Sequence, residues 1–356
     1  MTLPSGIDIA APENPNDRRA AFHALLHAEP GHRFLTSAWQ HPVGEEYEPE
    51  RFAAATVDFN RTWDWDWVKI NPRAVYYAEA WGSIYDPDDY HGVVPRLVRP
   101  AVASVADLAR IRPLDPQHNA VFAEHLASAR LIRAALADRA IVQTVFSPLS
   151  VLLQLAGLPL YPGVPVAGST TPFTFEDLVR SDPDGVRVAL TAIAQSLADY
   201  VRALLAPLEQ GGAGLDGIFY AVTGTASAGY FDQRAFAEHS RPHDLTVLAA
   251  AAAGATILHT CGPHAHPEWF TDYPISALHW DQFQPGNPPL ETSIGATAVG
   301  GVNNQLFAPG SDLTQVQAQL QTALTADLDR PFLLAPSCTI PTPADPASLR
   351  RLRDAS

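Results

Sequence analysis

Eight short apolar segments, spread along the chain, constrain the fold of this sequence more than any other feature. Several are nearly continuous apolar runs, as expected for parallel strands that are covered on both faces. The segments are Phe34–Trp39, Trp67–Asn71, Ile141–Phe146, Asp216–Ala221, Ala255–Thr260, Ser276–Trp280, Thr297–Val302 and Phe332–Pro336. Helical patterns lie between most of them, at Glu48–Trp65, Asn119–Asp138, Asp184–Ala206, Gln233–Ala253 and Asp312–Asp329.

This alternation predicts an α/β protein, with either an open doubly wound sheet or a closed barrel. Eight strands favour a single (β/α)₈ TIM barrel. The first strand is not followed by G-x-G-x-x-G or by G-x-x-x-x-G-K-[ST], so the usual nucleotide-binding folds are disfavoured. We expect an N-terminal lead-in over residues 1–30 and a catalytic barrel over residues 31–356. Long proline-rich insertions, residues 73–118 and 156–175, follow the second and third strands.

The charge of the chain excludes some classes of partner. Its 356 residues carry 23 Lys and Arg against 38 Asp and Glu, a formal charge of −15. Such a surface repels nucleic acid and anionic membranes. The N-terminus lacks the apolar core of a signal peptide, and the apolar stretch 245–258 is too short to span a bilayer. We therefore expect a cytoplasmic protein, with a homodimer as the default assembly.

The chemistry of the chain centres on His259, Cys261 and Cys338. The first two end the fifth predicted strand, and residues i and i+2 of a strand share a face. Cys338 lies just past the eighth predicted strand, and a closed barrel brings all strand C-termini to one rim, where active sites form. Each residue taken alone is more often structural. Together, one imidazole and two thiolates favour zinc, and three protein ligands leave an open catalytic position.

The motif around these residues resembles a known family. The segment H-T-C-G at 259–262, with S-C-T-I-P-T-P at 337–343, is similar to the zinc methyltransferase branch of the uroporphyrinogen decarboxylase superfamily. That branch includes methylcobalamin:coenzyme M methyltransferases. Further similar stretches are Leu215–Tyr220, Leu278–Asp281 and Val299–Asn303.

The resemblance implies that His259, Cys261 and Cys338 bind zinc. It also implies a transferase that activates a small thiol as a zinc-bound thiolate, which attacks a methyl group or another alkyl electrophile. The methyl donor in such relatives is a corrinoid, usually on a separate protein; free methylcobalamin and an epoxide-like electrophile stay open, as does the identity of the thiol. Asp281, after the sixth predicted strand, is either a fourth zinc ligand or a rim carboxylate that hydrogen-bonds to substrate or a loop.

One departure from the family bears on the alternative function, a metal-independent decarboxylase acting on a carboxylated substrate. The decarboxylases carry an N-terminal arginine-rich motif that grips porphyrin carboxylates. The corresponding segment here, residues 36–42, contains no arginine. Porphyrinogen decarboxylation is therefore disfavoured.

Four other residues lie at the ends of predicted strands and are candidates for substrate binding. They are His41, Asn71, Tyr220 and Asn303, after the first, second, fourth and seventh strands. Each could equally cap a helix or form a hydrogen bond at the rim.

Overall fold

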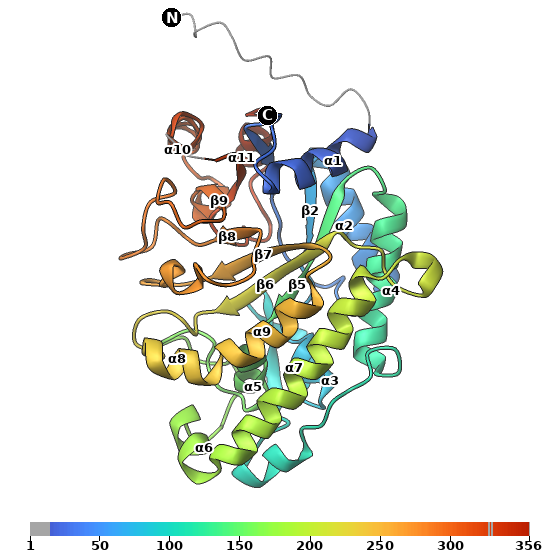
Figure 1. Cartoon of the computed structure of the whole chain (residues 1–356), viewed down its shortest axis with the longest axis vertical. Coiled ribbons are helices and arrows are strands. Elements are labelled where there is room, and N and C mark those ends of the chain that lie inside the picture. The colour runs from blue at the N-terminus through green and yellow to red at the C-terminus, as the bar shows by residue number, and fades with distance from the viewer. Residues whose placement is uncertain (1–14, 327, 329, 356) are drawn as a thin grey trace, which may run out of the picture.

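Eight parallel strands form one sheet that curves into a nearly closed barrel, which confirms the predicted fold (Figure 1). The computed structural model describes residues 15–326, 328 and 330–355. The order across the sheet is β1-β10-β9-β8-β7-β6-β5-β2. The strands are β1 (Phe34–Thr36), β2 (Trp67–Ile70), β5 (Ala140–Phe146), β6 (Gly217–Thr223), β7 (Ala255–Thr260), β8 (Ala277–His279), β9 (Thr297–Val302) and β10 (Phe332–Pro336).

The seam between β1 and β2 closes the barrel without a regular ladder. The backbone N–H of Asp66 donates to the carbonyl of Thr36 at 3.0 Å. The hydroxyl of Ser37 donates to the carbonyl of Trp67 at 2.7 Å. These bonds join the first and last strands of the sheet order, so the strand C-termini form one rim.

Helices cover the outside of the barrel, and side chains cap several of their N-termini. They are α2 (Pro49–Trp63), α4 (Ala120–Ala135), α7 (Pro183–Leu205), α8 (Gln233–His239), α9 (Arg241–Ala250), α10 (Leu313–Thr325) and α11 (Pro346–Arg353). The predicted helix Gln233–Ala253 is in fact two helices, α8 and α9, that meet at Ser240. Pro242 explains the break, because proline lacks an N–H and clashes with the carbonyl of the preceding turn. Asp329, where the last predicted helix ends, lies outside the described residues.

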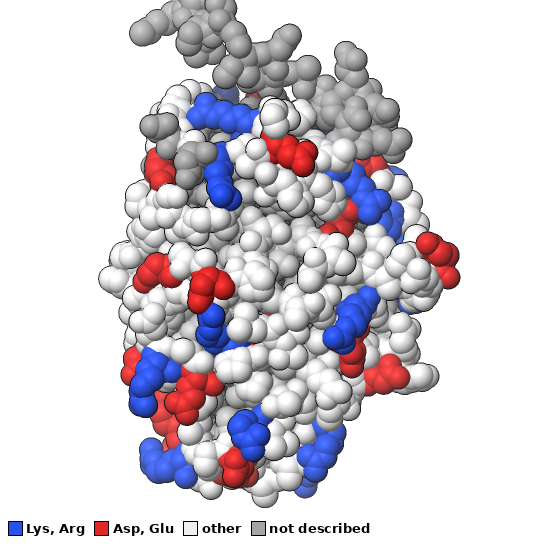
Figure 2. All heavy atoms as spheres, viewed as in Figure 1, with Lys and Arg blue, Asp and Glu red and all other residues white. Residues whose placement is uncertain are grey.

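Helix α7 is long and apolar enough to cross a membrane by length and composition alone. Its most apolar window is 67% buried inside the protein, as expected for a core helix. On the face in Figure 2, acidic and basic side chains are scattered rather than gathered by sign.

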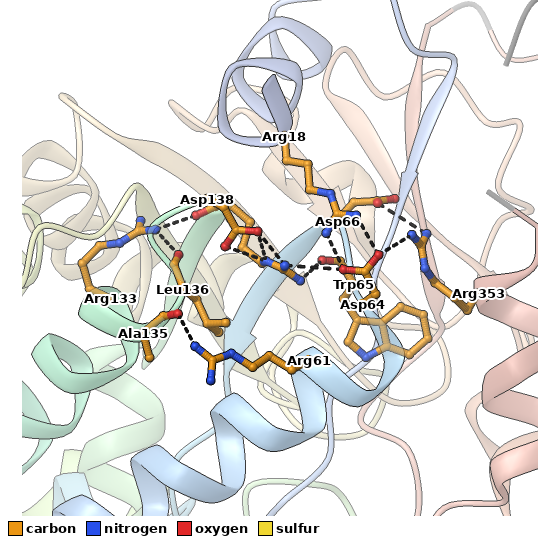
Figure 3. A network of polar contacts seen from close by, with 11 residues as sticks. Arg18, Arg61, Asp64, Trp65, Asp66, Arg133, Ala135, Leu136, Asp138 and Arg353 are labelled. Atoms are coloured by element: carbon orange, nitrogen blue, oxygen red, sulfur yellow. Dashed lines mark hydrogen bonds and ion pairs between the residues drawn. The ribbon is translucent and has the colours of Figure 1, made fainter. Parts of the chain in front are cut away.

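Helix α1 (Pro15–Leu26) closes the N-terminal end of the barrel, in a stretch for which the sequence predicted no element; residues 1–14 lie outside the described part. Phe22 is fully buried and packs with Trp39, Trp67 and Phe219 in the core inside the barrel. Arg18 pairs with Asp64, which also accepts from Arg353 (Figure 3).

The two predicted insertions cover the opposite end of the barrel. The first contains α3 (Tyr76–Ala80), the hairpin β3 (Ile84–His91) and β4 (Val94–Arg99), and the 3₁₀ helix η1 (Val105–Arg110). The second, residues 156–175, connects α5 (Pro148–Leu155) to α6 (Phe175–Ser181). The N–H of Leu97 donates to the carbonyl of Ala167 at 2.9 Å, which joins the two insertions into a roof. The sequence predicted neither the hairpin nor α5.

The described part of the chain also forms the short 3₁₀ helices η2 (Leu208–Gln210), η3 (Pro267–Phe270) and η4 (Asn304–Phe307).

Candidate metal centre

Strand alternation and barrel closure position the three predicted metal ligands. On β7 the side chains of Ala255 and Ile257 point into the barrel core, so His259 and Cys261 continue that inner face. Gly262, with φ of +97°, then turns the chain in a conformation that disfavours other residues. Cys338 follows β10, across the barrel from β7.

The predicted convergence of these residues is confirmed. The Sγ atoms of Cys261 and Cys338 are 3.8 Å apart, and Sγ of Cys338 is 4.0 Å from Nε2 of His259. All three ligand atoms lie within 4.8 Å of one another. Both cysteines are free. Two sulfurs bound at about 2.3 Å to one tetrahedral zinc ion would lie roughly 3.8 Å apart, so the donor set and its spacing both fit zinc.

The imidazole of His259 is held by the backbone of the neighbouring strand. Its Nδ1 is 3.3 Å from the carbonyl oxygen of His279 on β8. Since a carbonyl only accepts, Nδ1 carries the proton and Nε2 faces the sulfurs with a free lone pair. A hydrogen bond of this kind fixes the tautomer and orientation of metal-binding histidines.

The two thiols ionise unequally in the absence of a metal. The thiol of Cys261 donates a hydrogen bond to Cys338, and His259 lies beside it, so the pKa of Cys338 is well below its ordinary value. The same bond, followed by burial, raises the pKa of Cys261. A cation that replaces the shared proton would allow both sulfurs to bind as thiolates.

Asp281 lies beside this centre but outside the group of three ligand atoms. Its side chain is buried, and burial followed by nearby charge, including Cys338, raises its pKa. Oδ1 accepts from the N–H of Phe283 at 3.0 Å. In this arrangement Asp281 is a rim carboxylate that hydrogen-bonds to a loop.

A cavity of about 520 Å³ lies between the barrel rim and the roof. His259 and Cys338 line it. Cys261 forms a hydrogen bond with Cys338. The other polar residues of the lining include His41, Lys69, Asn71, Arg73, Thr144, Thr223 and His279. The roof contributes apolar side chains, among them Tyr85, Val94, Leu158, Val164 and Val166. The centre therefore lies at the wall of a largely apolar cavity.

Two of the four predicted substrate-binding residues, His41 and Asn71, line this cavity. Nδ1 of His41 is 3.2 Å from a carboxylate oxygen of Glu46. Oδ1 of Asn71 accepts a hydrogen bond of 2.6 Å from Lys69.

The other two, Tyr220 and Asn303, do not line it. Tyr220 points outward, where its hydroxyl donates to Asp244 of α9 at 2.6 Å. The inner face of β6 carries Phe219, Ala221 and Thr223 instead, because the strand alternates its sides. Asn303 caps η4 by accepting from the N–H of Gln305 at 2.9 Å. The structure thus gives both residues a structural partner away from the cavity.

Sequence reasoning missed Lys69, His279 and Tyr161 of the cavity wall. Lys69 had a usable signal, because it is the only lysine in the chain and falls in a predicted strand. His279 falls in a predicted strand too, yet only the register shows that it points inward. Tyr161 comes from an irregular insertion, which has no period that predicts its direction.

Comparisons with known proteins identify a family and a fold. The sequence model of the family described as uroporphyrinogen decarboxylase (URO-D) matches residues 45–356. A solved methyltransferase from Methanosarcina mazei is 17% identical, with a TM-score of 0.71 over 96% of this chain and 98% of that chain. At this identity the likeness shows the fold.

Two further solved structures are much less similar. A morphinone reductase mutant in complex with tetrahydroNAD has a TM-score of 0.39 at 11% identity, over 85% of this chain and 82% of that chain. A β-mannanase from the blue mussel Mytilus edulis has a TM-score of 0.35 at 10% identity, over 90% of each chain. A search of functionally curated proteins finds no match.

Proposed function

Because the chain belongs to the uroporphyrinogen decarboxylase family, we propose that it is a zinc-dependent methyl- or alkyltransferase with a thiol acceptor. The observation that carries the proposal is the convergence of one imidazole and two thiols within 4.8 Å at the barrel rim. This donor set suits zinc. The fold shared with a methyltransferase of Methanosarcina mazei supports the same function.

The residues of the centre would have separate roles in this reaction. His259, Cys261 and Cys338 would hold the metal, and the carbonyl of His279 orients the ring of His259. Zinc bound there supplies a Lewis acid that lowers the pKa of a coordinating thiol. Two cysteine ligands add negative charge, which favours a nucleophilic sulfur over hydrolysis; hydrolytic zinc sites more often use His₃ or His₂Glu.

The roof contributes apolar side chains to the cavity wall above the centre. A nucleophile is less strongly solvated beside such a wall than in bulk water. The alkyl donor would be a corrinoid, carried by a separate protein or free, or another small electrophile. We expect the reaction in the cytoplasm, where both cysteines stay reduced.

A metal-independent decarboxylase is the second candidate, and the name of the matching family supports it. The cavity does hold Lys69 and Arg73, which could contact substrate carboxylates. However, this chemistry leaves the paired thiols without a role.

A transfer assay separates the two candidates. Zinc-loaded protein is incubated with methylcobalamin or methyl iodide and with coenzyme M, homocysteine or 3-mercaptopropionate, and methyl thioethers are quantified by mass spectrometry. We expect zinc-dependent product with at least one pair, and none above background with Cys338→Ser. Product formed equally by the variant would refute the proposal. Release of CO₂ from uroporphyrinogen by metal-free protein would favour the decarboxylase.

A further inference from the structure

Lys69 is the only lysine among 356 residues; the other 22 basic side chains are arginines. It lies on β2 inside the barrel and lines the cavity beside the metal centre. Only 5% of its surface is exposed. A lysine is rarely buried so deeply without a paired charge, so this position needs a specific explanation.

The ammonium group of Lys69 has no ion-pair partner among the described residues. Nζ donates to Oδ1 of Asn71 at 2.6 Å. It also lies 4.4 Å from the ring centre of Phe219 and 5.0 Å from that of Trp39. These neutral contacts only partly offset the cost of removing a charge from water. Burial accordingly lowers the pKa of Lys69 to about 7.

The cavity wall offers Lys69 no carboxylate. The chain has 38 acidic residues, yet none lines the cavity in the described part of the chain. Arg73, the other cation of the wall, is already neutralised: it bonds to Glu79 at 2.6 Å and to Glu124 at 2.5 Å. An anion in the cavity would therefore meet the charge of Lys69, which no carboxylate of the described cavity wall offsets. The anionic group that acts on Lys69 is the sulfur of Cys338, whose charge a metal ion bound at the centre would offset.

The side-chain amide of Asn71 adds a hydrogen-bond donor beside the ammonium group of Lys69. Its Oδ1 accepts from Lys69, which fixes the orientation of the amide. Its Nδ2 is buried and has no partner in the described structure. A buried donor without an acceptor costs about 1–3 kcal/mol. A ligand oxygen that bonds to both Nζ and Nδ2 would relieve both costs.

We propose that Lys69 and Asn71 form a recognition site for an oxyanion, a carboxylate or sulfonate group carried by a small organic substrate whose apolar part lies against the roof. This inference rests on the proposed function in one respect: the same substrate would bring its reacting atom to the sulfur-rich centre. Lysine suits the site better than arginine because its charged group is compact and fits between the rings of Trp39 and Phe219.

The single lysine makes a direct test possible. Protein labelled with ¹³C at lysine Cε gives one side-chain resonance, and its pH titration reports on Lys69 alone. The probes are pentanoate, butane-1-sulfonate and the neutral analogue pentan-1-ol. An oxyanion within bonding distance raises the pKa of an ammonium group by about 1 or more. We expect this rise with at least one of the two anions and not with pentan-1-ol.

A matched pair of variants separates a local site from a general charge effect. Lys69→Met removes the cation of the cavity, and Arg234→Met removes an exposed cation, so both change the net charge equally. Calorimetry should show that Lys69→Met weakens binding of the responding anion about 10-fold or more, since a charge-assisted hydrogen bond contributes about 1.5–3 kcal/mol. Arg234→Met should bind like the wild type.

Two results would overturn the proposal. One is a lysine resonance that responds to no anion, or responds equally to pentan-1-ol. The other is equal anion affinity in Lys69→Met and the wild type. Neither measurement needs zinc or alkyl transfer, so failure of the oxyanion site and failure of the transferase proposal can be told apart. The titration of the wild type needs no variant to fold.

Discussion

The two ends of the barrel differ in how their charged groups are paired. At the N-terminal end, Asp216 accepts from Arg133 and from the N–H of Ile141, both at 2.8 Å. Asp64 is held there by Arg18 and Arg353 (Figure 3). At the C-terminal end, Nδ2 of Asn71 and Nδ1 of His279 are buried without partners in the described residues.

This difference indicates that the N-terminal end of the barrel contributes stability and that the C-terminal end contacts the ligand. Charged groups that pair with one another stabilise the fold and leave nothing for a ligand. Unpaired polar groups cost stability and are rare in native proteins, so each needs a reason. In barrels of this type the C-terminal rim carries the chemistry. Among the described residues, three with a buried unpaired polar atom line the cavity beside the His/Cys/Cys centre: Asn71, Gln154 and His279. We interpret these three as the ligand-facing part of the molecule.

The largest predicted effect is at the C-terminal end. Cys338→Ser should weaken zinc binding roughly 10³-fold or more, because a binding free energy of about 10–16 kcal/mol depends on few ligands. Competition with a chromophoric chelator measures the affinity. An affinity equal to that of the wild type would show that Cys338 is no ligand. It would also contradict the assignment of metal binding to the C-terminal end of the barrel.

The next effect is at the N-terminal end. Asp216→Ala leaves Arg133 buried beside the cavity of the removed carboxylate and should lower the free energy of unfolding by about 3 kcal/mol or more. Urea denaturation monitored by circular dichroism measures it. The exposed pair Asp199–Arg202 supplies the control: Asp199→Ala should cost less than about 1 kcal/mol. Zinc affinity should stay unchanged in both variants.

A smaller effect concerns Asn71. Asn71→Ala removes a buried donor that has no partner, but it also removes the acceptor of the buried Lys69 ammonium. The free energy of unfolding should therefore fall by about 1–3 kcal/mol. Affinity for the anion that responds in the lysine titration should fall about 3- to 10-fold. A large loss of stability with full anion affinity would instead place Asn71 among the structural residues.

The smallest effect is the pH dependence contributed by Asp64. Its pKa is lowered to about 2, mainly by hydrogen bonds from Arg18. A carboxyl with a lower pKa in the folded state stabilises the protein above its unfolded pKa of about 3.9. That contribution disappears as the pH falls towards 2. Denaturation curves between pH 5 and 2 should therefore be less pH-dependent in Asp64→Asn, by less than about 1 kcal/mol because Asp64 is half exposed.

Regular periodicity accounts for the parts of the fold that the sequence predicts. The eight strands are buried apolar runs, so their positions follow from composition alone. The β3–β4 hairpin was missed because the proline-rich insertion that contains it lacks a clear period. Helix α5 was missed because all eight of its residues are buried, so it has no polar face to mark a helical period. Helix α1 was missed because its amphipathic character is weak and its apolar residues find a partner only in the barrel end that they close.

The metal centre was predictable for a different reason. Two positions at i and i+2 on a strand share a face, and barrel closure brings distant strand ends together. Tyr220 was expected at the end of its strand, but β6 continues to Thr223. Because Phe219 and Ala221 face the cavity, strand alternation directs Tyr220 outward to α9. No local pattern could show that Lys69 lacks a carboxylate partner, since that depends on the whole cavity wall.

X-ray absorption at the zinc edge tests the central claim most directly. Zinc-loaded protein should show two sulfur ligands and at least one nitrogen ligand, from Cys261, Cys338 and His259. Saturation with an acceptor thiol should raise the number of sulfur ligands to three. A spectrum with fewer than two sulfurs, or one that no thiol alters, would contradict a thiol-activating His/Cys/Cys centre.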